Sequence, residues 1–279
     1  MKILVTGANG YLGRGIVKEL LDRGEIVIAT DFRTDGIDPR ARIFSENLFA
    51  IENPYQHFGK PDILLHLAWR NGFKHDDESH IIDLPKHYLF LKNRCASGIH
   101  QVAVMGTRHE IGFFEGSVDE NTPCHPVTNY GIAKNSLREF THCLCKKYGT
   151  VFQWLRGFYI VGNTPYGNSI FSKLLQAESE GKEAFPFTSG KNEYDFLDYP
   201  VFVDFVCATI LQDQINGIIN ISSGWPVSLG QRVEEFIRDN HLQIKLAYGT
   251  YPDRPYDSHA IWGNNKKIAE IRSYSKYGK

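Results

Sequence analysis

Near its start the chain reads Lys2-Ile3-Leu4-Val5-Thr6-Gly7-Ala8-Asn9-Gly10-Tyr11-Leu12-Gly13. A short β-branched and apolar run leads into glycines at positions 7, 10 and 13. Glycines at this spacing suit a tight turn, a close approach of the backbone to a pyrophosphate, and a close contact between helix and strand. The free amides at the start of the following helix would form an anion site. The stretch therefore predicts a strand, a turn and a helix that together bind a dinucleotide.

The residues that follow complete this predicted unit. Apolar residues recur at helical spacing after the turn, and Gly24 ends the helix. A second apolar strand over residues 25–30 ends at Asp31, close to where a dinucleotide fold keeps the acid that binds a ribose hydroxyl. This carboxylate would repel a 2′-phosphate, whereas Arg33 would accommodate one. NAD is therefore the expected cofactor, and NADP is the alternative.

A second stretch carries residue types suited to proton transfer. Asn129-Tyr130-Gly131-Ile132-Ala133-Lys134 places a phenol and an ammonium four residues apart, so both project from one face of a helix. A phenol titrates near ~10 and an adjacent cation favours the phenolate, so we expect Lys134 to lower the pKa of Tyr130. The pair is a candidate proton donor or acceptor. The apolar stripe expected to bury this helix comprises Ala133, Leu137, Phe140 and Leu144.

Further patterns lie at predicted strand ends. They read Asp62-Ile63-Leu64-Leu65-His66-Leu67-Ala68, Val102-Ala103-Val104-Met105-Gly106-Thr107, Leu155-Arg156-Gly157-Phe158 and Asn220-Ile221-Ser222-Ser223-Gly224. With the glycine turn and Tyr130-x-x-x-Lys134, they make the chain resemble the extended short-chain dehydrogenase/reductase family, which holds NAD-dependent nucleotide-sugar epimerases, dehydratases and ketoreductases. The resemblance implies an α/β fold with a Rossmann-type doubly wound parallel sheet and a smaller C-terminal substrate-binding lobe. It assigns residues 1–162 plus about 200–222 to the dinucleotide-binding domain, and about 163–199 plus 223–279 to the lobe.

The same resemblance implies a set of catalytic and cofactor-binding residues. Thr107 stands where the family has a hydroxyl that hydrogen-bonds the reacting oxygen; the alternative is that Thr107 only closes a turn. Tyr130 would transfer the proton, and Lys134 would bind the nicotinamide ribose. The implied cofactor-binding residues are Gly7, Asn9, Gly10, Tyr11, Leu12, Gly13, Asp31, Phe32, Arg33, Asn47, Leu48, Leu67, Ala68, Trp69, Tyr130 and Lys134.

The expected substrate-binding residues are Trp69, Arg70, Thr107, Tyr159 and Arg254. Trp69 stands where relatives carry small residues, and it either shapes the substrate pocket or covers a loop. Tyr159 replaces an asparagine that in the family touches the sugar phosphate. Arg254 matches a diphosphate-binding arginine of nucleotide-sugar enzymes, and the alternative is a surface arginine in a proline-rich loop.

Three other positions give simpler expectations. Tyr194 precedes Asp195-Phe196, where the family usually has an arginine that grips the nucleotide diphosphate. His66 lies within an apolar strand, so we expect a hydrogen-bonded core histidine rather than a catalyst. Residues 75–80 form a polar stretch that is expected to be a solvated surface loop.

Composition limits the classes of partner. The chain has 279 residues, of which 42% are hydrophobic and 23% charged, with a formal net charge of −1. This composition gives no excess of positive charge that would favour binding to nucleic acid or to a membrane surface. A small-molecule substrate is therefore expected. We expect a cytoplasmic protein, because a strand begins at once and no apolar run approaches the roughly twenty residues that span a bilayer. Five cysteines indicate free thiols, and no metal site is expected.

The resemblance implies a homodimer through helices near 81–98 and 128–148. For activity, the expected function is an NAD(P)-dependent 4-ketosugar-nucleotide reductase, because Arg108 and His109 stand where dehydratases carry an acid-base pair. A nucleotide-sugar epimerase is the first alternative. A non-catalytic dinucleotide-sensing protein is the second, although the presence of both Tyr130 and Lys134 argues against it.

Overall fold

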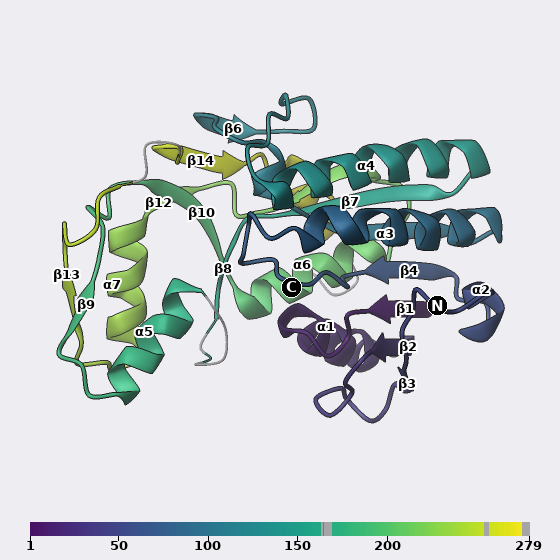
Figure 1. The fold of residues 1–279 in the computed structure, drawn as a ribbon, viewed down its shortest axis with the longest axis horizontal. Coiled ribbons are helices and arrows are strands. Elements are labelled where there is room, and N and C mark those ends of the chain that lie inside the picture. The colour runs from purple at the N-terminus through teal and green to yellow at the C-terminus, as the bar shows by residue number, and fades with distance from the viewer. Residues whose placement is uncertain (163, 165–168, 254–256, 275–279) are drawn as a thin grey trace.

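The computed structural model describes residues 1–162, 164, 169–253 and 257–274. Within these ranges the main sheet has seven parallel strands in the order β11-β7-β5-β4-β1-β2-β3 (Figure 1). The strands are β1 (Lys2–Thr6), β2 (Ile26–Asp31), β3 (Arg42–Ser45), β4 (Ile63–His66), β5 (Gln101–Thr107), β7 (Val151–Gly157) and β11 (Gly217–Ile221). The order runs outward in both directions from β1, which confirms the predicted doubly wound sheet.

Helices cover both faces of this sheet. One face carries α1 (Tyr11–Asp22), α6 (Tyr199–Ile210) and α8 (Lys266–Tyr274); the other carries α2 (Pro54–His57), α3 (Ser79–Ala96) and α4 (Asn129–Tyr148). Successive side chains of a strand point to opposite faces. Accordingly Ile3 and Val5 of β1 join the apolar layer under α1, while Leu4 joins the layer under α3 and α4. Both layers exclude water, which explains the near-continuous apolar runs in the strands.

The helix that carries the proposed proton donor has well-defined ends. The Thr128 hydroxyl accepts a hydrogen bond of 3.2 Å from the Gly131 amide at the start of α4. Gly149 ends the helix with a φ of 68°, a conformation that glycine adopts at little cost. Phe140 was expected on the buried stripe, but it is 46% exposed and contacts Tyr88 of α3 at 5.3 Å between ring centroids. The stripe prediction was wrong at this residue because α3 lies beside it rather than over it.

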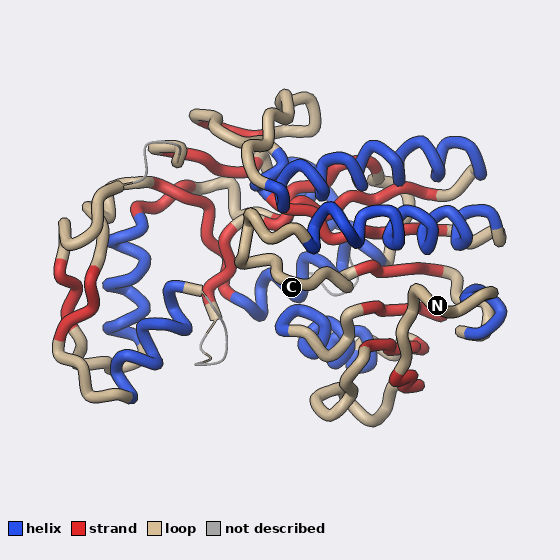
Figure 2. Tube along the Cα trace, viewed as in Figure 1, coloured by secondary structure: helices blue, strands red, loops and turns tan. Residues whose placement is uncertain are grey.

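A smaller unit lies beyond the carboxyl ends of the main strands (Figure 1), and Figure 2 shows that it contains both helices and strands. Its larger sheet contains β12 (Pro226–Ser228), β10 (Glu193–Asp198), β14 (Ala260–Gly263) and β6 (Gly116–Val118), and β8 (Tyr159–Val161) pairs with β10. A second sheet joins β9 (Ala184–Pro186) to β13 (Lys245–Ala247), and helices α5 (Ile170–Ser179) and α7 (Leu229–Asp239) pack beside it.

Two segments pack with a different unit from the one that the expected domain boundaries give them. Strand β6 lies within the range expected for the dinucleotide-binding domain, yet it pairs with β14 of the smaller unit. Helix α8 lies within the range expected for the lobe, yet it packs on α6 and β11 of the main sheet. Each unit therefore contains segments that are distant in the sequence.

The residues that the structure describes contain neither a membrane-spanning helix nor a cluster of metal-ligating side chains. Every helix in these ranges falls short of the length and apolar character needed to cross a membrane. The same ranges contain no cluster of three or more histidine, cysteine, aspartate or glutamate side chains that could hold a metal ion.

Candidate active site

The glycine turn after β1 is shaped by close backbone contacts. Gly7 has a φ of 69°, and a Cβ atom there would lie 2.7 Å from the Ala68 backbone nitrogen. A Cβ at Gly13 would lie 2.3 Å from the Gly7 carbonyl oxygen. Larger residues would therefore open the turn and separate it from the end of β4. This narrow backbone cradle at the start of α1 fits a dinucleotide pyrophosphate.

The end of β2 is tied to the glycine turn through Asp31. Its carboxylate accepts hydrogen bonds from the Asn9 amide at 3.0 Å and from the Phe32 amide at 2.7 Å. A carboxylate has about four acceptor positions, so it keeps capacity for a ribose hydroxyl. Arg33 is mostly exposed and lies 3.6 Å from Asp35. The structure thus brings Asp31 to the turn and leaves Arg33 at the rim.

Two further expected cofactor residues follow β3. The Asn47 side chain accepts a hydrogen bond of 3.2 Å from the Phe49 amide. The Leu48 side chain is buried in the apolar layer with Phe58 and Phe90. Leu48 is therefore part of the apolar core on this face of the main sheet.

The three expected catalytic side chains come together at the end of β5 and the start of α4. The Lys134 ammonium donates a hydrogen bond of 2.9 Å to the Met105 carbonyl oxygen. The Thr107 hydroxyl interacts with the Tyr130 phenol, an interaction that favours the phenolate. Thr107 also accepts a hydrogen bond of 3.3 Å from the His109 amide, so it both closes a turn and faces the phenol.

Burial controls the acidity of the pair. Burial raises the pKa of Tyr130 to about 12, and the hydrogen bond to Thr107 offsets only part of this rise. Burial also lowers the pKa of Lys134 to about 7, against the opposing charge of Glu110. The expected lowering of the Tyr130 pKa by Lys134 is therefore not found in the protein alone. The physical reason is that a buried ammonium loses its own charge near neutral pH.

Aromatic rings enclose the Tyr130 phenol on several sides. Ring centroids lie 5.5 Å away for His75, 5.2 Å for His80, 5.9 Å for His109 and 6.3 Å for Trp69. His75 also accepts the Tyr130 amide through its backbone oxygen at 2.8 Å. The expectation of a solvated loop over residues 75–80 was wrong at these histidines, because the loop folds back over the start of α4. Local sequence carried no signal for this long-range contact.

Trp69 contacts both Lys134 and a buried histidine pair. The Lys134 Nζ atom is 4.0 Å from the indole centroid, a cation–π geometry. The indole also stacks on His87 at 4.5 Å, and His87 Nδ1 is 2.8 Å from His66 Nε2. His66 is also 2.8 Å from the Thr6 hydroxyl, which confirms the expected hydrogen-bonded core histidine. Trp69 therefore contacts both members of the Tyr130–Lys134 pair.

A buried carboxylate that the sequence analysis did not single out organises the turn after β5. Glu110 is fully buried and accepts a hydrogen bond of 2.6 Å from the Thr107 amide. Trp154 Nε1 lies 2.9 Å from each carboxylate oxygen, and Arg156 Nε lies 3.4 Å from Oε2. The only sequence signal was the spacing of Thr107 and Glu110, which is that of a capping box.

Arg70 and Tyr159, two further expected substrate residues, contact different elements of the fold. Arg70 donates to Asp83 of α3 and thus points along that helix. Tyr159 stacks on Tyr194 with centroids 4.5 Å apart and an interplanar angle of 27°. Arg254 lies outside the described residues.

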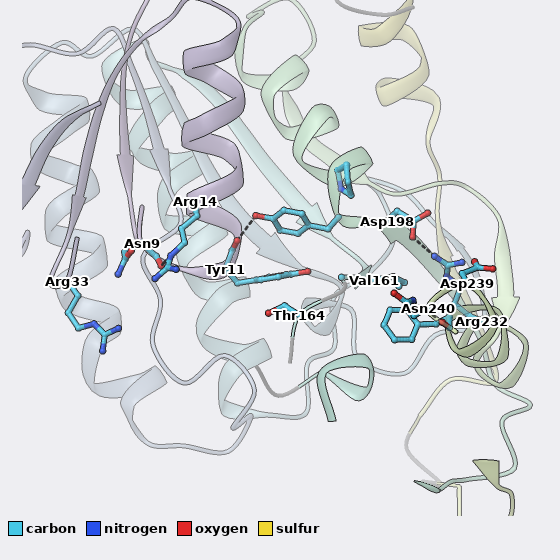
Figure 3. A pocket seen from close by; sticks show the side chains of 14 residues that line it. Asn9, Tyr11, Arg14, Arg33, Val161, Thr164, Asp198, Arg232, Asp239 and Asn240 are labelled. Atoms are coloured by element: carbon cyan, nitrogen blue, oxygen red, sulfur yellow. Dashed lines mark hydrogen bonds and ion pairs between the residues drawn. The ribbon is translucent and has the colours of Figure 1, made fainter. Parts of the chain in front are cut away.

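A cavity of about 990 Å³ opens beside the glycine turn (Figure 3). Its walls are the turn, the ends of β8 and β10, the start of α6 and one face of α7. Asn9, Tyr11 and Arg33 line it, whereas Thr107, Tyr130 and Lys134 are not among its described lining residues. The Tyr199 hydroxyl donates to the Tyr11 carbonyl oxygen at 2.6 Å, which fixes the cavity wall to the turn. The cavity therefore adjoins the expected cofactor site and not the proton-transfer residues.

The fold and this arrangement of residues define a class of protein. The model of the NAD dependent epimerase/dehydratase family matches residues 3–222, so the chain belongs to that family. This confirms the predicted family and the predicted class of enzyme, an NAD(P)-dependent oxidoreductase or epimerase of the extended short-chain dehydrogenase/reductase type.

Particular relatives narrow the comparison. The dTDP-6-deoxy-L-talose 4-dehydrogenase (NAD(+)) of Aggregatibacter actinomycetemcomitans is 44% identical over 271 residues, which cover 94% of this chain and 99% of the relative. A UDP-glucose 4-epimerase structure from Thermotoga maritima superposes with a TM-score of 0.80 at 22% identity, covering 97% of this chain and 92% of the other. A UDP-glucose 4-epimerase from Thermus thermophilus, complexed with NAD, gives a TM-score of 0.82 at 18% identity, covering 100% and 95%. At these identities the two structures establish the fold alone.

Proposed function

We propose that the chain interconverts a 4-hydroxyl and a 4-keto group on a dTDP-linked 6-deoxyhexose, with NAD as the hydride carrier. The observation that supports this most is the convergence of Thr107, Tyr130 and Lys134 in a chain that is 44% identical to a dTDP-6-deoxy-L-talose 4-dehydrogenase over nearly its whole length. A 4-ketosugar-nucleotide reductase and a 4-dehydrogenase run one reaction in opposite directions.

The proposed chemistry assigns a separate task to each side chain. Bound NAD supplies a hydride acceptor in one direction, and NADH a hydride donor in the other. For oxidation, the Tyr130 phenolate removes the proton of the sugar hydroxyl; for reduction, the Tyr130 phenol returns a proton to the carbonyl oxygen. Thr107 hydrogen-bonds the same oxygen and stabilises the charge that develops on it. Lys134 hydrogen-bonds the nicotinamide ribose.

The cofactor assignment uses residues around the glycine turn. The backbone of the turn would bind the pyrophosphate, and Asp31 would bind the adenosine ribose. Leu67 and Ala68, whose backbone adjoins the turn, would also contact the cofactor. The closeness of the Gly7 and Ala68 backbones supports a single cradle built from β1 and β4. Trp69 would keep Lys134 in place while the ribose binds.

Cofactor turnover tests the proposal. Purified protein is mixed with dTDP-6-deoxy-L-talose and NAD, and the absorbance of NADH is followed together with the sugar product by mass spectrometry. We expect stoichiometric NADH formation and a product two mass units lighter. An epimerase would instead change the sugar with no net NADH, and a non-catalytic protein would bind NAD without turnover. Either result would contradict the proposal.

We further propose a homodimer that buries the outer faces of α3 and α4. Ile82 and Leu89 of α3 are 58% and 53% exposed, and Phe140 of α4 is 46% exposed. Exposed apolar side chains gathered on a paired helix surface are typical of a protein interface. Light scattering should give twice the chain mass for the wild type, and a smaller mass for Leu89→Glu.

The proposed compartment is the cytoplasm. The Sγ atoms of Cys95 and Cys145 lie 3.9 Å apart in a buried contact between α3 and α4, yet both are free thiols. A reducing compartment preserves such a pair.

We also propose that the chain divides into a dinucleotide-binding domain, residues 1–162 plus about 200–222, and a substrate lobe. Strand β6 and helix α8 are the segments that link the two.

A further inference from the structure

An arginine directly after the catalytic threonine carries a charge that the described chain does not neutralise. Arg108 is only 8% exposed. Its Nε atom is buried and has no hydrogen-bond partner among the described residues, while the guanidinium hydrogen-bonds the Tyr159 side chain. No ion pair joins it to a carboxylate of the described residues, and Glu110, two residues on, pairs with Arg138 and Arg156. A buried charge without an opposite charge beside it is costly. The position therefore favours an anion that arrives with a ligand.

The surroundings of this guanidinium point toward the smaller unit. Its Cζ atom lies 5.5 Å from the ring centroid of Tyr159, and Tyr159 stacks in turn on Tyr194. Burial raises the pKa of Tyr159, so the ring facing Arg108 is neutral. Asp257 also influences Tyr159, but it makes no ion pair with Arg108 in the described structure. The arginine thus faces an aromatic column and not an acid.

The column contains the position at which the family usually carries a cation. Tyr194 stands before Asp195-Phe196, in the place of the arginine that grips the diphosphate. The neighbouring Asp195 accepts hydrogen bonds from the amides of Ser223 and Gly224 at 2.7 and 2.9 Å, so this part of β10 serves as a structural anchor. A diphosphate at this end of the cleft therefore lacks its usual cation from β10.

We propose that Arg108 supplies this missing cation and binds the diphosphate of the nucleotide sugar. The inference rests on the proposed function, because it assumes a nucleoside diphosphate substrate. A guanidinium presents a planar fork of donors that matches two phosphate oxygens. In the proposed function the adjacent Thr107 hydrogen-bonds the reacting sugar oxygen. Thr107 and Arg108 would therefore position the reacting oxygen and the diphosphate from one turn of the chain. A neutral sugar hydroxyl would leave the charge of Arg108 unmatched, which is why the diphosphate is favoured.

Binding of dTDP without its sugar gives a direct test. Calorimetric titrations compare wild type, Arg108→Gln and Arg108→Lys, with Arg40→Gln as a control that removes an exposed arginine paired with Asp38 and Asp22. We expect Arg108→Gln to weaken dTDP binding by roughly 10- to 100-fold, as loss of a charge-assisted hydrogen bond predicts. Arg108→Lys keeps the charge but not the fork and should lie between. Salt should weaken dTDP binding less in Arg108→Gln than in wild type.

Several outcomes would overturn the assignment. Unchanged dTDP affinity in Arg108→Gln, with a raised KM only for the complete nucleotide sugar, would move Arg108 to the sugar ring. A lower melting temperature together with weaker NAD binding would make Arg108 a structural residue. Wild-type protein that binds neither dTDP nor UDP would also overturn it. Failure of the proposed function looks different, because dTDP would bind through Arg108 while no sugar reduced NAD.

Discussion

The Glu110 carboxylate accepts the backbone amide of Thr107 at 2.6 Å, so a fully buried acid holds the residue whose hydroxyl faces the Tyr130 phenol. The same carboxylate meets Trp154 and Arg156 of β7. The turn after β5 is therefore joined to the neighbouring strand by charge-assisted hydrogen bonds, which are shorter and stronger than neutral ones. In the proposed reaction Glu110 would be a positioning residue, because it touches Thr107 and not the substrate.

Replacing this acid should affect both stability and turnover. Glu110→Gln removes the charge that compensates the buried Arg156, and breaking a buried ion pair costs roughly 3–5 kcal/mol. We expect urea unfolding to show a loss of this order and kcat to fall while the KM for NAD stays near its wild-type value. Glu120→Gln, which breaks an exposed pair with Lys267, is the control and should change stability by less than about 1 kcal/mol. Wild-type stability and kcat in Glu110→Gln would contradict the positioning role.

The contrast between Asp31 and Glu110 shows which parts of the site could be predicted from the sequence. Asp31, the glycine turn and the Tyr130–Lys134 spacing are local patterns, and local geometry alone brings their groups to one edge or one helix face. The capping-box spacing of Thr107 and Glu110 indicates a turn but not the contacts of Glu110 with β7, and His75 reaches Tyr130 across a loop without any spacing signal. The doubly wound order followed from alternating strands and helices, whereas the pKa of Lys134 depends on how Trp69 and Met105 enclose it.

Removing the phenol oxygen should separate chemistry from cofactor binding. Tyr130→Phe keeps the ring that packs against His75 and His80, but it cannot transfer a proton. We expect kcat to fall by roughly 10²- to 10⁴-fold, with the Kd for NAD nearly unchanged. Tyr248→Phe removes a phenol that donates to Glu234 far along the chain, and it should retain activity. Near-normal turnover in Tyr130→Phe would exclude the phenol from the mechanism.

The raised pKa of Tyr130 predicts different pH dependences for the two directions of the reaction. Oxidation needs the phenolate, and a pKa of about 12 leaves little of it at neutral pH in the free enzyme. The kcat/KM for sugar oxidation should therefore rise with pH through the alkaline range, while that for reduction, which needs the phenol, should not rise. Stopped-flow or steady-state rates from about pH 6 to 10 would check this, within limits set by stability. A flat oxidation profile would show that another group accepts the proton.

Cofactor preference should respond to the carboxylate at the end of β2. Asp31→Asn keeps an oxygen that accepts the Asn9 amide, but it removes the negative charge that opposes a 2′-phosphate. We expect NADP to bind more tightly and NAD more weakly, so that the ratio of their Kd values shifts by roughly tenfold or more toward NADP. Asp35→Asn, at the exposed partner of Arg33, provides a matched control for the charge change. Unchanged affinities for both cofactors in Asp31→Asn would remove Asp31 from ribose recognition.

The buried Lys134 ammonium should make stability depend on pH between neutral and alkaline conditions. In the folded chain the pKa is lowered from 10.5 to about 7, so between these values the unfolded chain binds a proton that the folded chain does not. Stability therefore rises with pH across this window, and below pH 7 the full penalty, on the order of 5 kcal/mol, is present. Lys134→Met should stabilise the protein at pH 7, abolish this rise and weaken NAD binding. Lys146→Met, at an exposed site on the same helix, should leave the rise intact. Denaturation at pH 6, 7, 8 and 9 checks both variants, and an equal slope in Lys134→Met and wild type would show that Lys134 stays charged.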